Sequence, residues 1–111
     1  MIRLWVRFPP GAQRIVPLCG TRRKQMYKVY LLESLRDKKW YVGYTPSNVL
    51  QRLEKHNDGL VQSTKSFRPW RLIYCEVYIN RDDATGREKF LKSGAGRKFL
   101  EKQLHNYLDN K

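Results

Sequence analysis

The sequence predicts a small α+β domain in which helices flank a three-stranded antiparallel sheet. Three runs rich in β-forming residues lie at 27–33, 40–44 and 70–79, and helix-start signals follow the second and third runs. A further helical pattern begins after residue 96. The resulting order, β-β-α-β-α-α, describes one α+β domain, and 111 residues suffice for one modest core.

The first two strands are predicted to form a hairpin. Residues 27–33 read Tyr-Lys-Val-Tyr-Leu-Leu-Glu, and the polar segment 34–39 makes the turn. Residues 40–44, Trp-Tyr-Val-Gly-Tyr, return as the antiparallel partner. The run 70–79 is the most apolar of the chain and therefore predicts a central strand.

A first helix should follow the hairpin. Either Thr45 caps it, with Pro46 at the first helical position, or Ser47 does. The segment 57–59, Asn-Asp-Gly, is typical of a helix end. The predicted buried face of this helix consists of Val49, Leu50 and Leu53.

Two more helices are predicted in the last third of the chain. The segment 80–83 offers caps for a second helix that runs to about Lys92, and 93–96, Ser-Gly-Ala-Gly, breaks it. A third helix spans 97–108. The predicted core contacts are Ala84, Phe90 and Leu91 in the second helix and Phe99, Leu100, Leu104 and Leu108 in the third.

The basic composition indicates a polyanionic partner. The chain has a formal net charge of +13 and a pI near 10.1, and nucleic acid is the default partner of so small and basic a domain. A basic surface kept for solubility, or an acidic protein or membrane partner, would also account for the charge.

Residues 1–25 differ in character from the rest. They carry six basic residues, no acid and several prolines and glycines. We expect a disordered or non-native extension, because residues 5–12 resemble the in-frame translation of the 3′ part of a tRNA gene; synthesis would then start at Met26. A basic arm that adds phosphate contacts is the other interpretation. The domain, 26–111, keeps 17 basic against 10 acidic residues, so it remains basic without the extension.

The two cysteines, Cys19 and Cys75, form no Cys-x-x-Cys pair and have no histidine cluster beside them. Neither structural zinc nor a disulfide scaffold is therefore expected, and a reducing, cytoplasmic location fits. No apolar run approaches the ~20 residues of a membrane helix, and residues 1–25 lack the long apolar segment of a signal peptide. We expect no membrane association.

Four side chains of the first three elements are candidates for chemistry. Tyr30 and Tyr41 lie on neighbouring strands of the hairpin and could share one face, although tyrosines in strands are usually packing residues. Arg52 and His56 share one face of the first helix, because they are four residues apart. Guanidinium suits a phosphate, and imidazole can relay a proton. A solvated helix face with an exposed histidine is the ordinary interpretation of that pair.

Other polar residues extend this set. Glu88 lies in the second helix between basic neighbours, and one carboxylate is enough to hold a Mg²⁺ ion that keeps most of its waters. Lys65 and Arg68 lie in a loop that could contact a nucleic-acid backbone, although such loops are often merely solvated. Four other residues are assigned to the core or to structure: Trp40, Trp70, Cys75 and His105.

The order and spacing of these residues resemble the GIY-YIG nuclease domain, especially its small single-domain branch related to the amino-terminal domain of excinuclease C. The resemblance runs from Tyr27 to about Leu100. Its motifs are Val29-Tyr30, Tyr41-Val42-Gly43-Tyr44-Thr45, Arg52-Leu53-x-x-His56-Asn57, Ser63-Thr64-Lys65, Arg68-Pro69-Trp70, Ala84-x-x-Arg87-Glu88-x-x-Leu91-Lys92 and Gly96-Arg97.

The resemblance implies hydrolysis of a DNA phosphodiester by water with the help of one Mg²⁺ or Mn²⁺ ion. Tyr30 and Tyr41 would orient or deprotonate the water and hold the phosphate. Arg52 would stabilise the charge on the phosphoryl oxygens, His56 would assist proton transfer, and Glu88 would bind the metal. The residues predicted to contact nucleic acid are Lys65, Arg68 and Arg97.

Two departures from the family pattern concern the first and last motifs. The first reads Lys28-Val29-Tyr30, without the leading glycine, and keeps the tyrosine. The asparagine that several members place after the metal-bearing helix has no clear equivalent, since the chain has 93–97, Ser-Gly-Ala-Gly-Arg, in that region. The second departure bears on the strength of catalysis and on the substrate.

The sequence therefore predicts a metal-dependent DNA endonuclease of repair or recombination without a small-molecule cofactor; its oligomeric state is open, with a monomer slightly favoured. RNA is a possible substrate as well. One alternative is a nucleic-acid-binding module of the same fold that cuts poorly or needs a partner, because no second domain selects the target. Another is a basic structural protein of a ribonucleoprotein assembly, which would not require the tyrosine, arginine and glutamate set.

Overall fold

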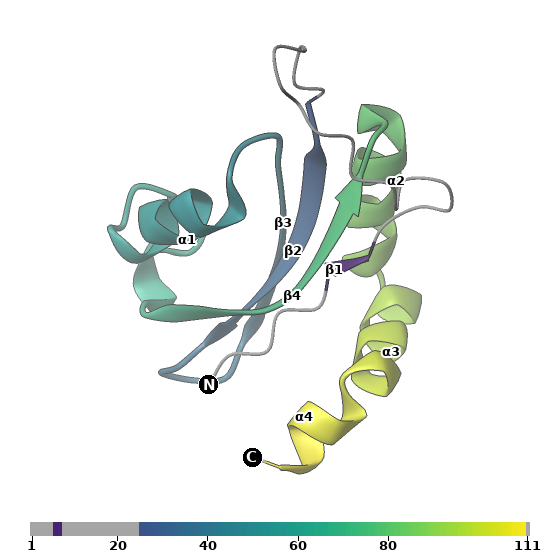
Figure 1. Ribbon diagram of the computed structural model, residues 1–111. Coiled ribbons are helices and arrows are strands. Elements are labelled where there is room, and N and C mark those ends of the chain that lie inside the picture. The colour runs from purple at the N-terminus through teal and green to yellow at the C-terminus, as the bar shows by residue number, and fades with distance from the viewer. Residues whose placement is uncertain (1–5, 8–24, 111) are drawn as a thin grey trace.

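A computed structural model describes residues 6–7 and 25–110, and its centre is a twisted sheet (Figure 1). Strands β2 (Tyr27–Ser34), β3 (Trp40–Thr45) and β4 (Trp70–Tyr78) are antiparallel, with β2 in the middle. The predicted three-stranded sheet is confirmed. The two-residue strand β1 (Val6–Arg7) pairs parallel to β4 and was not predicted, so the full order is β1-β4-β2-β3.

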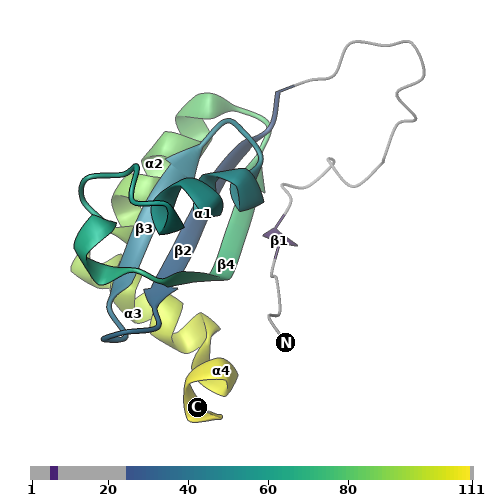
Figure 2. The ribbon, with the colours of Figure 1, turned by 90° about the vertical axis from the view of Figure 1, so that its left-hand side faces the viewer.

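Helices cover both faces of the sheet. Figure 2 shows α1 in front of the strands and α2 and α3 behind them. A 3₁₀ turn, η1, lies in the connection between α1 and β4. The bounds are α1 Val49–Asn57, η1 Lys65–Phe67, α2 Arg81–Leu91, α3 Gly94–Gln103 and α4 His105–Asp109.

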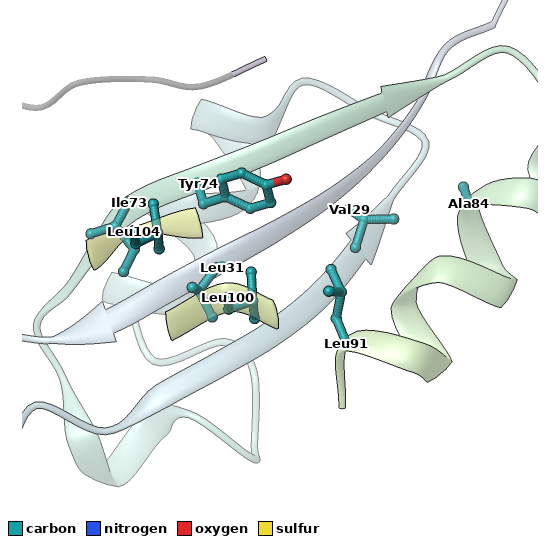
Figure 3. Close-up of a cluster of buried hydrophobic side chains, with 8 residues drawn as sticks. All are labelled: Val29, Leu31, Ile73, Tyr74, Ala84, Leu91, Leu100 and Leu104. Atoms are coloured by element: carbon teal, nitrogen blue, oxygen red, sulfur yellow. The ribbon is translucent and has the colours of Figure 1, made fainter. Parts of the chain in front are cut away.

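Alternation along β2 creates two cores, because successive side chains of a strand point to opposite faces. Val29 and Leu31 point toward α2 and α3, where they pack with Leu91 and Leu100 (Figure 3). Tyr30 and its neighbours pack in the second cluster, on the α1 face, with Val49 and Leu53 at its edge. A strand buried on both faces explains the nearly continuous apolar run of β2.

A bulge in β4 modifies this alternation. Leu31 pairs with Tyr74, but Leu32 pairs with Leu72, so Ile73 is the extra residue. As a result Ile73 and Tyr74, although consecutive, both belong to the cluster under α2 and α3. The bulge is the reason that β4 does not show a strict period of two in sequence.

The helix caps differ from the prediction in one case. Asn48, and neither Thr45 nor Ser47, caps α1: its side chain accepts hydrogen bonds from the backbone N–H groups of residues 50 and 51. Asn80 caps α2 within the predicted segment, and Ser93 caps α3. Segment 93–96 therefore ends one helix and begins the next.

Three details of the prediction are wrong: the burial of two side chains and the continuity of the third helix. Leu50 is 53% exposed because it lies on the outer side of α1, and Phe90 is 37% exposed on the rim of α2. The third helix is not continuous to residue 108, since Leu104 leaves helical geometry (φ −107°, ψ 22°) and separates α3 from α4. Leu100 and Leu104 are buried as predicted.

Two buried carboxylates tie the helices to the strands. Glu33 accepts hydrogen bonds from Trp40 Nε1 (3.1 Å) and from the Tyr107 hydroxyl (2.6 Å) of α4. Glu76 binds Arg87 of α2 through Nε (2.9 Å) and Nη2 (3.1 Å). Burial acts to raise the pKa of Glu76, but hydrogen bonds from Arg87 and from two tyrosines more than offset it and hold that pKa below its usual value.

The predicted extension lies mostly outside the described residues, since only 6–7 and 25 of its positions are described. Its predicted disorder, and the start of synthesis at Met26, therefore stay predictions. Of the helices in the described ranges, none is long and apolar enough to cross a membrane.

Close contact between α2 and α3 generates a stability prediction. A Cβ atom at Gly96 would lie 2.1 Å from the backbone oxygen of Phe90 and 2.5 Å from Leu91 Cα, whereas one at Gly86 would meet nothing within 4 Å. We expect Gly96→Ala to lower the free energy of unfolding by at least about 2 kcal/mol, because backbone must move. Gly86→Ala should raise it by about 0.5–1 kcal/mol.

Urea denaturation of the parent, Gly96→Ala and Gly86→Ala measures these changes in the free energy of unfolding. Equal unfolding midpoints for Gly96→Ala and the parent would show that the two helices do not pack as described.

Candidate active site

A buried phenol–imidazole contact lies between the sheet and α1. The Tyr30 hydroxyl is 2.9 Å from His56 Nε2, and both side chains are buried, at 1% and 0% exposure. The Tyr30 ring reaches this position by crossing over Gly43 of β3, where a Cβ atom would lie 2.3 Å from Tyr30 Cζ. Glycine at position 43 is therefore required for the phenol to reach α1.

Arg52 joins this contact from one turn earlier in α1. Its Nε donates a hydrogen bond to the Tyr30 hydroxyl oxygen (3.3 Å). Its terminal nitrogens make no hydrogen bond within the described part of the chain, and the side chain is half-buried. The predicted shared face of Arg52 and His56 is confirmed by these contacts, but His56 is buried, not solvated.

Thr64 completes a chain of hydrogen bonds. Which group donates in each bond follows from Arg52 at one end and the Val61 carbonyl oxygen at the other. Arg52 can only donate, so the Tyr30 proton is free to point at His56 Nε2. The neutral imidazole then carries its proton on Nδ1, which is 2.7 Å from Thr64 Oγ1. The Thr64 hydroxyl in turn donates to the carbonyl oxygen of Val61 (3.4 Å).

Burial shifts the pKa values of this group. It lowers the pKa of His56 to about 4, with help from the positive charge of Arg52, so the imidazole is neutral at physiological pH. Burial also raises the pKa of Tyr30, while the hydrogen bond from Arg52 acts in the opposite direction. Tyr30 and His56 are therefore both uncharged at physiological pH and are joined by a neutral hydrogen bond.

Tyr41 lies on the same side of the sheet and is more accessible. Its ring packs edge-on against His56, with ring centroids 5.1 Å apart, and against Trp70 at 6.2 Å. The side chain is half-buried, and its hydroxyl has no hydrogen-bond partner among residues 25–110. This hydroxyl is available to a ligand, whereas that of Tyr30 is not.

Glu88 approaches from the other layer, along the open edge of β3. It lies one turn before Lys92 in α2, and its carboxylate forms an ion pair with the Lys92 ammonium (3.1 Å). Lys92 also lines a cavity together with Tyr41. Glu88 is also close enough to Tyr30 for its charge to contribute, after burial, to the raised pKa of that phenol. Four of the five predicted residues thus lie together between the sheet and α1, and Glu88 lies in the helical layer on the other face, within electrostatic range of Tyr30.

The three predicted nucleic-acid contacts are more scattered. Lys65 and Arg68 are exposed on the loop around η1, where Arg68 Nε donates to the Lys65 carbonyl oxygen (2.9 Å). Arg97 lies on α3, with its guanidinium 4.1 Å from the centroid of the Trp40 ring and an ion pair to Glu101. The loop pair and Arg97 therefore belong to opposite faces of the sheet.

The donors at this edge fit a hard divalent cation. Glu88 has a 23% exposed side chain, so its carboxylate is open to solvent, and the other candidate donors are phenol oxygens. Within the described ranges no three His, Cys, Asp or Glu side chains gather to form a closed metal centre. A single accessible carboxylate suits Mg²⁺ or Mn²⁺ that keeps waters and takes phosphate oxygens as further ligands.

Sequence reasoning missed two parts of the site. Thr64 was considered only as part of a loop that contacts nucleic acid, although its hydroxyl holds His56. Gly43 was recognised within a motif, but its spatial role under the Tyr30 ring was not predicted. Neither role has a local sequence signal, because each depends on a contact between distant elements.

Comparison with known families identifies the class of the protein as a nuclease. Residues 26–101 match the profile of the GIY-YIG catalytic domain, which covers more than half of the chain. The chain therefore belongs to the GIY-YIG family, as its motifs predicted.

The relatives are mainly small bacterial proteins. UPF0213 protein YazA of Bacillus subtilis is 32% identical over 77 residues, 68% of this chain and 72% of that protein. A UPF0213 protein of Pediococcus pentosaceus is 40% identical over 70 residues, 60% of this chain and 73% of that protein. The structure-specific endonuclease subunit SLX1 of Debaryomyces hansenii is 43% identical over 68 residues, 54% of this chain but 19% of its own length.

A solved structure also matches part of the chain. The solution NMR structure of a UPF0213 protein from Bacillus halodurans has 30% sequence identity and a TM-score of 0.45, and the match covers 70% of this chain and 84% of that one.

The buried histidine generates a pH prediction. Its pKa is 6.5 in the unfolded chain and about 4 in the folded protein, so the unfolded state binds more protons between these values. His56 therefore favours the folded state fully above pH 6.5, and this contribution, up to about 3 kcal/mol, is lost as the pH falls toward 4.

Urea denaturation at pH 7 and pH 4.5 of the parent and of His56→Gln tests the prediction. Other groups titrate equally in both proteins, so the parent should lose more stability than the variant. Equal losses would mean that His56 is not buried as a neutral base.

Proposed function

We propose that the protein is a divalent-metal-dependent endonuclease that hydrolyses DNA phosphodiester bonds in repair or recombination. The observation that carries the proposal is the Arg52–Tyr30–His56–Thr64 chain, which positions a guanidinium beside the sheet, with the ring of the accessible Tyr41 packed against His56. Membership of a nuclease family and the basic charge support it. The presence of one buried thiol, Cys75, among the described residues suits the reducing cytoplasm.

In the proposed mechanism, Arg52 binds the phosphate that is cut. Its Nε is held by Tyr30, so its terminal nitrogens are presented in a fixed orientation to two phosphoryl oxygens. Charge grows on these oxygens as water attacks, and a guanidinium held in advance stabilises that charge without reorganising.

The two tyrosines take different roles. The accessible Tyr41 hydroxyl orients the attacking water, while buried Tyr30 accepts the hydrogen bond that positions Arg52 and donates one to His56. This division follows from burial, because a side chain that is 1% exposed cannot contact a nucleic-acid backbone in this conformation.

A bound Mg²⁺ or Mn²⁺ at Glu88 would polarise the phosphate and help the leaving oxygen depart. The Glu88 carboxylate forms an ion pair with the Lys92 ammonium and remains partly open to solvent, so a metal ion can reach it. At this exposure the pair contributes little to stability.

Replacement of the phosphate and metal ligands should remove cleavage. We expect Arg52→Ala and Glu88→Ala each to lower the rate of DNA cleavage with Mg²⁺ by at least about 100-fold. DNA binding should persist in Glu88→Ala, because loss of an acid does not weaken attraction to phosphate, and it should fall with added salt in every variant.

Matched controls are available for both changes. Glu101→Ala removes an acid that, like Glu88, pairs with a basic residue four positions away, and Arg81→Ala removes one exposed positive charge. Both should cut like the parent. Undiminished cutting by Arg52→Ala or Glu88→Ala would contradict the site, and binding without cutting in the parent would favour the binding-module alternative.

Thr64 should act as a positioning residue. In Thr64→Val the shape is kept but His56 Nδ1 loses its acceptor, so the imidazole proton no longer has a fixed place and the Tyr30–His56 contact that supports Arg52 is weakened. We expect kcat to fall about 100-fold with KM nearly unchanged, and Thr64→Ser to restore it. The ¹⁵N shifts of His56 should report a change of tautomer in Thr64→Val alone. Unchanged shifts would show that Thr64 has a purely structural role.

A further inference from the structure

An aromatic cavity adjoins the site. It has a volume of about 320 Å³ and lies beside the first half of β3, between the loop around η1 and the end of α2. Tyr41 and Thr64 line it, and both also contact His56. A group bound in this cavity would therefore lie beside Tyr41 and Thr64, the two residues that connect it to His56.

Four aromatic residues line this cavity: Trp40, Tyr41, Phe67 and Trp70. Trp70 packs edge-on against Tyr41, with centroids 6.2 Å apart, and against Phe67 at 6.5 Å. Trp70 is fixed, because its indole Nε1 donates to the Thr64 carbonyl oxygen (2.9 Å), whereas Phe67 and Tyr41 are partly exposed. Partly exposed aromatic rings at a basic surface are typical of sites on which nucleobases stack.

Two lysines border the aromatic wall. The Lys39 ammonium lies 4.1 Å from the centroid of the Phe67 ring, and Lys92 lines the cavity from the end of α2. Aromatic faces for a base together with ammonium groups for its phosphates match the two halves of a nucleotide. A base on the Phe67 face would shift the Lys39 ammonium toward the adjoining phosphate.

A second cavity, which Arg52 itself lines, has a different character. It has a volume of about 290 Å³ and is lined mainly by polar and charged residues, among them Ser47, Gln51 and Lys55. Such a lining suits the sugar–phosphate backbone and offers little surface for stacking. Of these two cavities, only the aromatic one suits a base.

We propose that the aromatic cavity binds the base of a nucleotide next to the scissile linkage, and that the substrate is single-stranded or branched DNA. The proposal rests on the proposed function and adds the substrate class to it. A base in continuous duplex is stacked and paired, so its entry into the cavity would require unstacking, whereas an unpaired base enters at little cost.

Binding without metal tests the cavity separately from cleavage. A short labelled single-stranded oligonucleotide is compared by fluorescence anisotropy with an abasic strand of the same length, which keeps the phosphates and lacks the bases. The parent should bind the strand with bases about tenfold more tightly. Phe67→Leu keeps the apolar volume without the aromatic face, and should bring this ratio close to one while binding of the abasic strand stays unchanged.

Phe90→Leu is the matched control, because Phe90 is a partly exposed ring on α2 that packs against Phe99, away from the cavity. It should keep the ratio of the parent. Equal binding of both strands by the parent, a ratio unchanged in Phe67→Leu, or no binding of either strand at low salt would each overturn the proposal. Failure of the proposed function would appear separately, as an absence of cleavage with Mg²⁺ while the binding ratio is kept.

Discussion

The hydrogen bond between the Tyr30 hydroxyl and His56 Nε2 is the contact on which the candidate site depends. It joins the central strand to α1, whose nine residues would be only marginally helical without packing against the sheet. Formation of this bond requires a neutral imidazole, a ring that passes over Gly43, and a phenol whose oxygen is still free to accept from Arg52. One buried contact thus positions the half-buried Arg52 side chain.

The same arrangement explains why the site lies at an edge of the sheet. Strand β3 has no partner on its outer side among the described strands, so residues from the two helical layers can meet there without a loop between them. The α1 layer supplies Arg52 and its support, and the α2 layer supplies Glu88 and Lys92. Tyr41, on β3 itself, lies between them and forms one wall of the neighbouring aromatic cavity.

Stability and function are separated in this small domain. Glu33 and Glu76 are buried carboxylates that accept hydrogen bonds from α4 and α2, and they hold the helical layer on the face opposite the Tyr30 contact. On the α1 face the polar groups are arranged in a chain that ends at the surface. The network around Glu33 and Glu76 holds the helices on the sheet, whereas the network around Tyr30 positions Arg52 where a ligand can reach it.

The sequence by itself determined the three antiparallel strands, the helices between and after them, and the family, because alternation, capping signals and motif spacing are local properties. It also placed Arg52 and His56 on one helix face. Only the tertiary structure decided that Tyr30 is buried and Tyr41 accessible, that Asn48 caps α1, that Leu50 and Phe90 are exposed, and that Thr64 holds His56. Burial and hydrogen-bond partners depend on which distant segments pack together, and no window of neighbouring residues contains that information.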